Sequence, residues 1–261
     1  MSVLILMYHG VEARQGPLFI DPSTFAAHAD AIVASQLPVL TVTEVGDLLR
    51  EHRLPDRAIA LTFDDGFLSV IEQAAPVLVE RNLRATVFCV AGRLGGTNQW
   101  PTGRPGAPHV DLAAAVDLST LVSAGFEIGA HGMDHEPFDT EDPVVIQREV
   151  AGARVLLEQR IGVPVRALAY PYGAAPTPTA LALVRETYRV ACTTRIGRVV
   201  DGSDPDMLPR VDAHYLRSPR LFRTALNGGA DAYLAVRRAA AIARRRVRSD
   251  YSPRRAKATE S

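Results

Sequence analysis

Short apolar runs alternate with helical patterns along most of this 261-residue chain. Two of the helical segments open with Asp-Pro, at residues 21–22 and 142–143, which places an N-cap before a proline in the first turn. Strands that alternate with helices form parallel sheets, either a closed barrel or a doubly wound open sheet. The apolar runs are residues 3–8, 38–42, 58–63, 84–90, 126–130, 165–170, 189–193 and 208–213. Their number favours an α/β fold of the TIM-like kind, a (β/α) barrel of about seven parallel strands, slightly smaller than the usual eightfold one, with a helical C-terminal extension.

The charges are unevenly distributed along the chain. Of 29 basic and 29 acidic residues, nine basic and two acidic ones fall in residues 237–261. We therefore expect a barrel domain over residues 1–236 and a basic, Arg-rich helix and tail, partly disordered, over 237–261. The acidic excess of the barrel argues against a nucleic-acid partner. The tail is either solvated and partly disordered or a docking surface for anionic lipid, nucleic acid or a phosphorylated substrate.

No targeting signal stands out in the sequence. The apolar N-terminus (residues 1–7) has no preceding basic residue and no small-residue cleavage site, so it predicts a first strand rather than a signal peptide. No apolar run approaches the roughly 18 residues of a membrane span. Cys89 and Cys192 each lie in a strand-like run, which favours buried thiols in a reducing compartment. We expect a cytoplasmic protein.

Two adjacent carboxylates follow the run Ala58–Leu61, in the sequence Thr62-Phe63-Asp64-Asp65-Gly66. Consecutive residues of a regular strand point to opposite faces, so Asp64 and Asp65 could not share a site in mid-strand. At the carboxyl end of a strand, with Gly66 releasing the backbone into a turn, they can converge. A β/α barrel builds its active site at that end.

A pair of histidines four residues apart follows a second run. His131 and His135 would lie about 13 Å apart in an extended strand at roughly 3.3 Å per residue, too far to share a metal. Glycines at 129 and 132 favour a turned segment, which brings the two rings together. Two histidines and one carboxylate then form a metal site with positions left for water.

A third turn, Tyr170-Pro171-Tyr172-Gly173, ends a third run. Pro171 and Gly173 predict a sharp turn that can present the N–H of Tyr172 to an oxyanion. The Gly- and Pro-rich segment 92–111 is long for a loop in a compact domain, and its Trp100 either stacks on a sugar ring or pins the loop. His9 ends the first run and is a candidate to line the same pocket.

Two further histidines, His28 and His52, fall in helical patterns. We expect both to lie on the surface.

These clusters, in this order and spacing, resemble the polysaccharide deacetylases of carbohydrate esterase family 4 (the NodB-homology domain). The similarity covers roughly residues 3–215, including the opening Met7-Tyr8-His9-Gly10-Val11. It implies a distorted barrel and metal-dependent removal of an acetyl group from a sugar. By position, the resemblance implies that Asp64 is the general base. It also implies that Asp65, His131 and His135 hold a divalent metal, most often Zn²⁺, with Co²⁺, Ni²⁺ or Mn²⁺ as alternatives.

Three positions depart from the pattern of that family. Gly132 stands where a Ser or Thr is frequent. The arginine that orients the base is expected two residues before Pro171, where this chain has Ala169, and Arg210 is the candidate to replace it. The late Leu-x-His that supplies the general acid has no clean match. His214 is the candidate by order and position, and a surface histidine is the alternative.

We therefore expect a metal-dependent hydrolase that removes acetyl from an N-acetylated amino sugar, which can be a polysaccharide, a glycoside or a biosynthetic intermediate. The same motifs allow an O-acetyl esterase or a cyclic-amide hydrolase. A non-catalytic sugar-binding homologue is the remaining alternative, although pure binding has no need of a base at Asp64.

Overall fold

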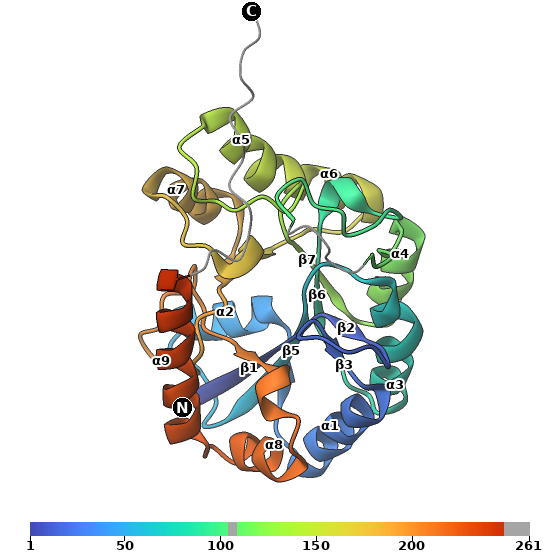
Figure 1. The fold of residues 1–261 in the computed structure, drawn as a ribbon, viewed down its shortest axis with the longest axis vertical. Coiled ribbons are helices and arrows are strands. Elements are labelled where there is room, and N and C mark those ends of the chain that lie inside the picture. Colours follow the sequence, from blue (N-terminus) through green and yellow to red (C-terminus); the bar gives the residue numbers. More distant parts are fainter. Residues whose placement is uncertain (104–108, 248–261) are drawn as a thin grey trace, which may run out of the picture.

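The computed structural model describes residues 1–103 and 109–247 (Figure 1). The strands in this part are β1 Ser2–Tyr8, β2 Gly10–Val11, β3 Phe19–Ile20, β4 Val39–Leu40, β5 Ala58–Phe63, β6 Thr86–Cys89, β7 Glu127–Ala130, β8 Ala167–Ala169, β9 Val190–Cys192, β10 Val199–Val200 and β11 Val211–Asp212. The α-helices are α1 Pro22–Ser35, α2 Val42–Arg50, α3 Ala75–Glu80, α4 Ala115–Ser123, α5 Pro143–Gln147, α6 Ala153–Ile161, α7 Pro178–Thr187, α8 Pro219–Leu226 and α9 Asp231–Val247.

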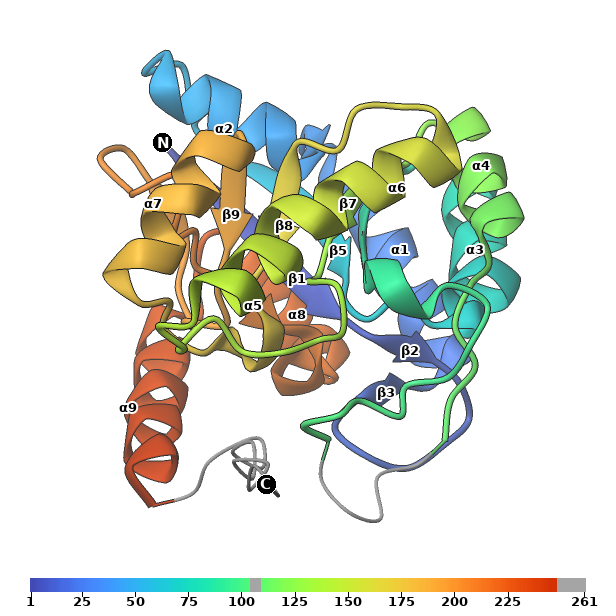
Figure 2. The ribbon, with the colours of Figure 1, turned by 90° about the horizontal axis from the view of Figure 1, so that it is seen from above.

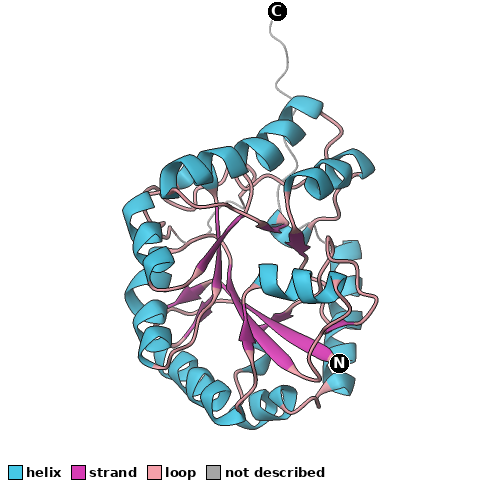
Figure 3. Cartoon of the chain, turned by 180° about the vertical axis from the view of Figure 1, so that it is seen from behind, coloured by secondary structure: helices cyan, strands magenta, loops and turns pink. Residues whose placement is uncertain are grey.

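The strands form a barrel-like sheet surrounded by helices (Figure 3). From β1 the parallel order runs through β5, β6, β7 and β8 to β9. The other edge of β1 pairs with β11 in parallel near its carboxyl end and with antiparallel β10 near its start. A parallel bridge from Cys192 in β9 to Leu208, just before β11, brings the two ends of the sheet together. The expected distorted (β/α) barrel is confirmed, whereas β10 and the small β2–β3 ribbon were not predicted.

The Asp-Pro signals begin helices as expected. The Asp21 carboxylate accepts a hydrogen bond from the N–H of Ser23 at the start of α1, and Asp142 accepts from the N–H groups of Val144 and Val145 at the start of α5. Each cap satisfies N–H groups that have no partner within the helix.

Alternation along the strands decides which residues enter the barrel. Ala58 and Ala60 of β5 pack in an interior cluster that α2 closes at the amino-terminal end of the barrel. Ile59 and Leu61 belong to the larger cluster between the sheet and the outer helices. The period of two continues to Asp64, which is therefore directed inward.

The expected surface position of His28 is wrong. Only 2 % of this residue is exposed, and its ring stacks on Phe222 at 3.7 Å. Nδ1 accepts a hydrogen bond from the Tyr8 hydroxyl at 3.0 Å and Nε2 donates to the Leu216 carbonyl at 3.2 Å, a pattern that suits the neutral ring. Helical periodicity did not reveal this, because the polar partners of His28 come from β1 and from the segment before α8.

Burial lowers the pKa of His28 from 6.5 to about 4, although the hydrogen bond to Leu216 opposes this. The unfolded chain binds the proton more tightly, so the contribution of His28 to stability is present above pH 6.5 and is lost as the pH falls toward 4. The difference between the pKa values of the unfolded and folded states corresponds to about 3 kcal/mol of folding free energy. We expect His28→Gln to lose less stability between pH 7 and pH 5 than the wild type does, as measured by urea unfolding. Parallel pH profiles of the two proteins would contradict this.

The C-terminal helices pack beside the barrel (Figure 1). The proposed domain boundary at residue 236 falls inside α9, and residues 248–261 lie outside the described residues. No helix in the described ranges is long and apolar enough to cross a membrane. Cys89 and Cys192 are buried free thiols, as the sequence predicts.

Candidate active site

Asp64 forms a buried bidentate ion pair with Arg210. The two guanidinium N–H groups donate to Oδ1 at 2.6 Å and to Oδ2 at 2.7 Å, and the side chains are 3 % and 0 % exposed. This fork geometry fixes the plane of the carboxylate. Burial by itself would raise the pKa of Asp64, but the charge of Arg210, with those of His131 and His9, outweighs it and lowers the pKa.

Arg210 reaches Asp64 through the interior of the barrel. Its Nε donates to the Thr193 carbonyl at 2.9 Å, and one terminal nitrogen donates to the Thr62 hydroxyl at 3.1 Å. The guanidinium lies 5.5 Å from the centre of the Phe88 ring. Arg210 directly precedes β11, so the guanidinium beside Asp64 comes from that end of the sheet. It does not come from position 169, where this chain has a small interior Ala.

The three expected metal ligands lie together. Asp65 Oδ1 is 3.4 Å from His131 Nε2 and 3.3 Å from His135 Nε2. One potential ligand atom from each residue falls within 4.8 Å of the others, and all three residues are buried. Two imidazoles and one carboxylate form a donor set that suits zinc and related divalent metals.

The second ring nitrogens of the histidines differ in their surroundings. His131 Nδ1 donates to the Ala169 carbonyl at 2.8 Å, which directs Nε2 toward Asp65. Such a hydrogen bond is the usual way in which a metal-binding histidine is oriented. His135 Nδ1 is buried and has no hydrogen-bond partner within the described part of the chain. The donor set and this orientation fit a bound cation.

Burial opposes ionisation of Asp65, yet hydrogen bonds from both histidines hold its pKa well below the ordinary range. Burial would lower the pKa of His131, but Asp65 and Asp64 raise it overall. For His135 the effect of burial is larger than the opposing effect of Asp65, and its pKa is lowered. The charge balance of the cluster thus favours an ionised carboxylate at position 65.

Three residues of the site adopt positive φ. The values are 71° for Asp65, 60° for His135 and 56° for Tyr172. Non-glycine residues pay a cost of order 1–3 kcal/mol in such conformations, and these conformations are common at functional sites. The turned backbone at Asp65 lets the second carboxylate join the first, which regular strand geometry would prevent.

Glu149 shapes the loop between the two histidines, a role that the sequence reasoning missed. It lies in the π-helical turn η3 (Arg148–Gly152), is 1 % exposed, and accepts hydrogen bonds from the N–H groups of Met133 and Asp134. A Cβ at Gly132, whose φ is 79°, would lie 2.8 Å from Glu149 Oε2, so a side chain here would be strained and would displace the Glu149 carboxylate. The sequence does hold one signal for this role, because Glu149 is a charged residue next to Val150 on the apolar face of a predicted helix.

Aromatic side chains surround His135. The Trp100 ring stacks on it at 4.6 Å and an interplanar angle of 21°, and the Tyr172 ring meets it edge-on at 4.4 Å. The Thr102 hydroxyl lies 3.3 Å from the Tyr172 hydroxyl. Pro171 and Tyr172 belong to the 3₁₀ turn η4 (Pro171–Gly173) after β8. Trp100 therefore packs against a candidate metal ligand and anchors this part of the 92–111 segment.

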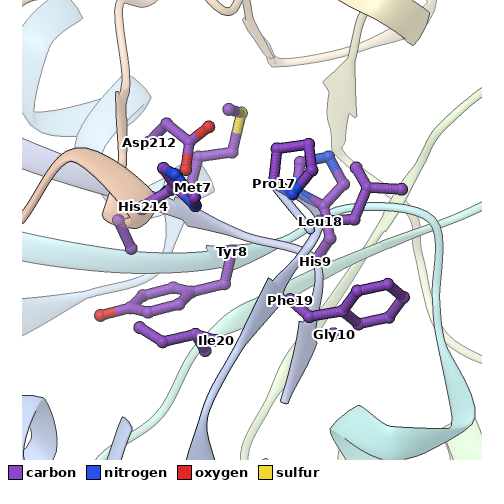
Figure 4. A pocket seen from close by; sticks show the side chains of 11 residues that line it. Met7, Tyr8, His9, Gly10, Pro17, Leu18, Phe19, Ile20, Asp212 and His214 are labelled. Atoms are coloured by element: carbon purple, nitrogen blue, oxygen red, sulfur yellow. The ribbon is translucent and has the colours of Figure 1, made fainter. Parts of the chain in front are cut away.

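Figure 4 shows His9 and His214 around the same pocket. Both line a small pocket beside Asp212, the inward-facing end of β11. Burial raises the pKa of Asp212, and the charge of His9 opposes this; the charge of His9 is also a small part of what lowers the pKa values of Asp64 and Asp65. Burial lowers the pKa of His214, with further effects from Arg217 and Asp212. His9 thus influences the pKa values of Asp64 and Asp65, whereas His214 and Asp212 influence the pKa values of each other.

Known proteins resemble this chain in sequence and in fold. Residues 51–191 match the polysaccharide deacetylase family. The chain is 24 % identical over 194 residues to YxkH of Bacillus subtilis, which covers 74 % of this chain and 64 % of that protein. It is 22 % identical over 196 residues to the poly-β-1,6-N-acetyl-D-glucosamine N-deacetylase of Staphylococcus epidermidis, covering 72 % and 65 %. The chain thus spans less than two thirds of the length of these relatives.

Two solved structures share the fold. IcaB from Ammonifex degensii superposes with a TM-score of 0.72 at 24 % identity, over 87 % of this chain and 96 % of that one. The Streptococcus pyogenes deacetylase PplD, solved with acetate, gives 0.70 at 22 % identity, over 81 % and 92 %. The family match covers more than half of the chain, including the TFDDG, His-x-x-x-His and Pro-Tyr-Gly motifs, and the chain belongs to the polysaccharide deacetylase family.

Proposed function

We propose that this protein is a metal-dependent hydrolase that removes the acetyl group from an N-acetylated amino sugar. The observation that carries the proposal is the juxtaposition of a cation site, Asp65 with His131 and His135, and a second carboxylate, Asp64, held by Arg210. When bound, a divalent cation supplies Lewis acidity that polarises a carbonyl and acidifies water. Asp64 is then the base that accepts the proton of the attacking water.

The ion pair with Arg210 suits Asp64 to that role. It keeps the carboxylate ionised in a buried site and holds both oxygens in one orientation. A sugar-binding module needs no such ionised group beside its cation. Tyr172 contributes its backbone N–H to the developing oxyanion in this proposal, and Trp100 and Pro171 shape the space beside it.

We assign the general acid to His9 rather than to His214. His9 follows β1 directly and influences both aspartates of the carboxylate pair. Asp212, in register with Met7 on the neighbouring strand, lines the same pocket as His9, and the charge of His9 opposes the rise in its pKa that burial causes. An imidazolium at this place can protonate the leaving amine as the tetrahedral intermediate collapses.

Variants of the two histidines distinguish these assignments. His9→Gln is expected to lower kcat/KM about 10²–10⁴-fold and to remove the alkaline limb of the pH–rate profile, because the protonated donor is lost. His214→Gln is expected to leave both nearly unchanged and is the matched control. If the alkaline limb disappears in His214→Gln instead, the acid is His214.

Acetate release tests the activity itself. We expect the purified protein to release acetate from N-acetylglucosamine oligomers, to lose this activity after treatment with a chelator, and to regain it with Zn²⁺, Co²⁺, Ni²⁺ or Mn²⁺. Acetylated xylan and a cyclic amide, assayed in parallel, separate an N-deacetylase from the esterase and amidase alternatives. Absence of acetate release from every N-acetylhexosamine conjugate would overturn the proposal.

The N-acetylglucosamine substrate class is favoured by the named activity of the Staphylococcus epidermidis relative. The cytoplasmic location expected from the sequence remains a prediction, which fractionation of the producing cells would test.

A further inference from the structure

Helix α9 (Asp231–Val247) carries an apolar stripe that no other element covers in the described part of the chain. Val236 is 68 % exposed and Ile242 is 50 % exposed. Exposed alanines at helical spacing continue the stripe, at positions 232, 235, 239 and 243. Residues three and four apart share a face, so these side chains form one strip along the helix.

The opposite face holds α9 against the barrel. Leu234 is 4 % exposed, and the Tyr233 hydroxyl donates to the Tyr215 carbonyl at 2.8 Å. The Arg237 guanidinium lies over both the Tyr215 and Tyr233 rings, at 5.0 Å and 5.3 Å. The packing of the opposite face therefore fixes the orientation of α9, and this orientation directs the stripe outward.

The sequence surrounding the stripe is strongly basic. Arg238 is exposed, and the last turns of the helix add Arg244, Arg245 and Arg246. From residue 237 to the end, the chain has nine basic and two acidic residues. Apolar and basic residues thus occur together in the sequence of α9.

The position of α9 relates it to the candidate active site. Tyr215, which α9 contacts, belongs to the 3₁₀ turn η5 (Ala213–Leu216), directly after β11 at the carboxyl ends of the strands. In Figure 2, α9 projects on the same side of the molecule as β2 and β3, which follow the carboxyl end of β1. A surface bound by α9 would therefore lie on the side where the barrel opens.

We propose that α9 docks on a membrane surface that contains anionic lipid. The stripe around Val236 and Ile242 inserts at the boundary between headgroups and acyl chains, and the arginines pair with lipid phosphates. Charge complementarity favours this occupant over a second copy of the chain, because two such helices would bring arginines against arginines. It is favoured over nucleic acid because phosphate binding makes no use of exposed aliphatic side chains.

Vesicle co-sedimentation of the full chain tests the proposal. We expect binding to vesicles of phosphatidylcholine mixed with phosphatidylglycerol, little binding to phosphatidylcholine alone, and weaker binding as salt increases. Val236→Asp/Ile242→Asp is expected to reduce the partition coefficient by about tenfold or more. The matched control is Val116→Asp, at an equally exposed valine (71 %) on α4, which should bind like the wild type. Circular dichroism confirms that each variant is folded.

Other outcomes would overturn the membrane proposal or assign α9 to a different partner. No binding to the anionic vesicles, or an equal loss in the Val116 control, would overturn the proposal. Sedimentation velocity without lipid that shows a dimer abolished by the double substitution would assign the stripe to a second copy instead. Binding of a DNA duplex as tight as that of anionic vesicles, and unaffected by the double substitution, would assign the charge to nucleic acid.

Discussion

Replacing Asp64 with Asn is expected to lower kcat for acetate release by about 10²–10⁴-fold, with the metal still bound. Asn has nearly the shape of Asp but cannot accept a proton, whereas the cation site consists of Asp65, His131 and His135. The measurement combines steady-state kinetics with metal content by atomic absorption. KM should change much less than kcat, because the lost interaction acts in the transition state.

Two further variants separate the loss of the base from other effects of the substitution. Asp64→Asn leaves Arg210 buried without its counter-charge, so the assay is run well below the melting temperature of the variant. The double substitution Asp64→Asn/Arg210→Met removes both charges and should be equally inactive. Asp201→Asn, at an exposed carboxylate (57 %), is the matched control and should be fully active. Substantial activity in Asp64→Asn would exclude Asp64 as the base.

Replacing Arg210 with Met is expected to destabilise the fold by about 3–5 kcal/mol, because it leaves the Asp64 carboxylate ionised and unpaired in the barrel interior. It should also move the acid limb of the pH–rate profile to higher pH. Without the guanidinium, burial acts with less opposition and raises the pKa of Asp64, so the base becomes protonated at a higher pH. Urea unfolding and the pH dependence of kcat/KM measure the two effects.

The double substitution and a surface arginine serve as controls for stability. Asp64→Asn/Arg210→Met should recover most of the lost stability, because no unpaired charge remains. Arg185→Met breaks ion pairs of an exposed arginine with Asp204 and Asp206 and should change stability little. An Arg210→Met variant no less stable than Arg185→Met would show that the buried pair is not needed for folding.

Local signals in the sequence predicted much of the fold. The Asp-Pro caps at 21–22 and 142–143 begin helices, and the principal apolar runs contain the parallel strands. β10 and the β2–β3 ribbon were not predicted, because these two-residue strands do not form part of a longer apolar run of their own. The location of His28 was wrong because a buried polar residue depends on partners far along the chain, here Tyr8 and Leu216.

The candidate site was predictable where its residues come in short motifs. Asp64, Asp65, His131 and His135 could be placed at strand ends, and strand ends of a parallel barrel meet at one side. Arg210 could be named as a candidate partner of Asp64, but its bidentate contact depends on how the barrel closes through Leu208 and β11. Glu149 was missed because its function is to bind the backbone of a distant loop.

The order of strands, helices and motifs, and with it the family, follows from the sequence alone, because periodicity, caps and strand-end clusters are local properties. The tertiary structure decided which groups meet. It directed the Asp65 side chain into the site through a positive φ and brought Arg210 across the barrel to Asp64. These relations depend on strand register and barrel closure, in which residues more than a hundred positions apart come into contact, and no local pattern of amino acids encodes such a distance.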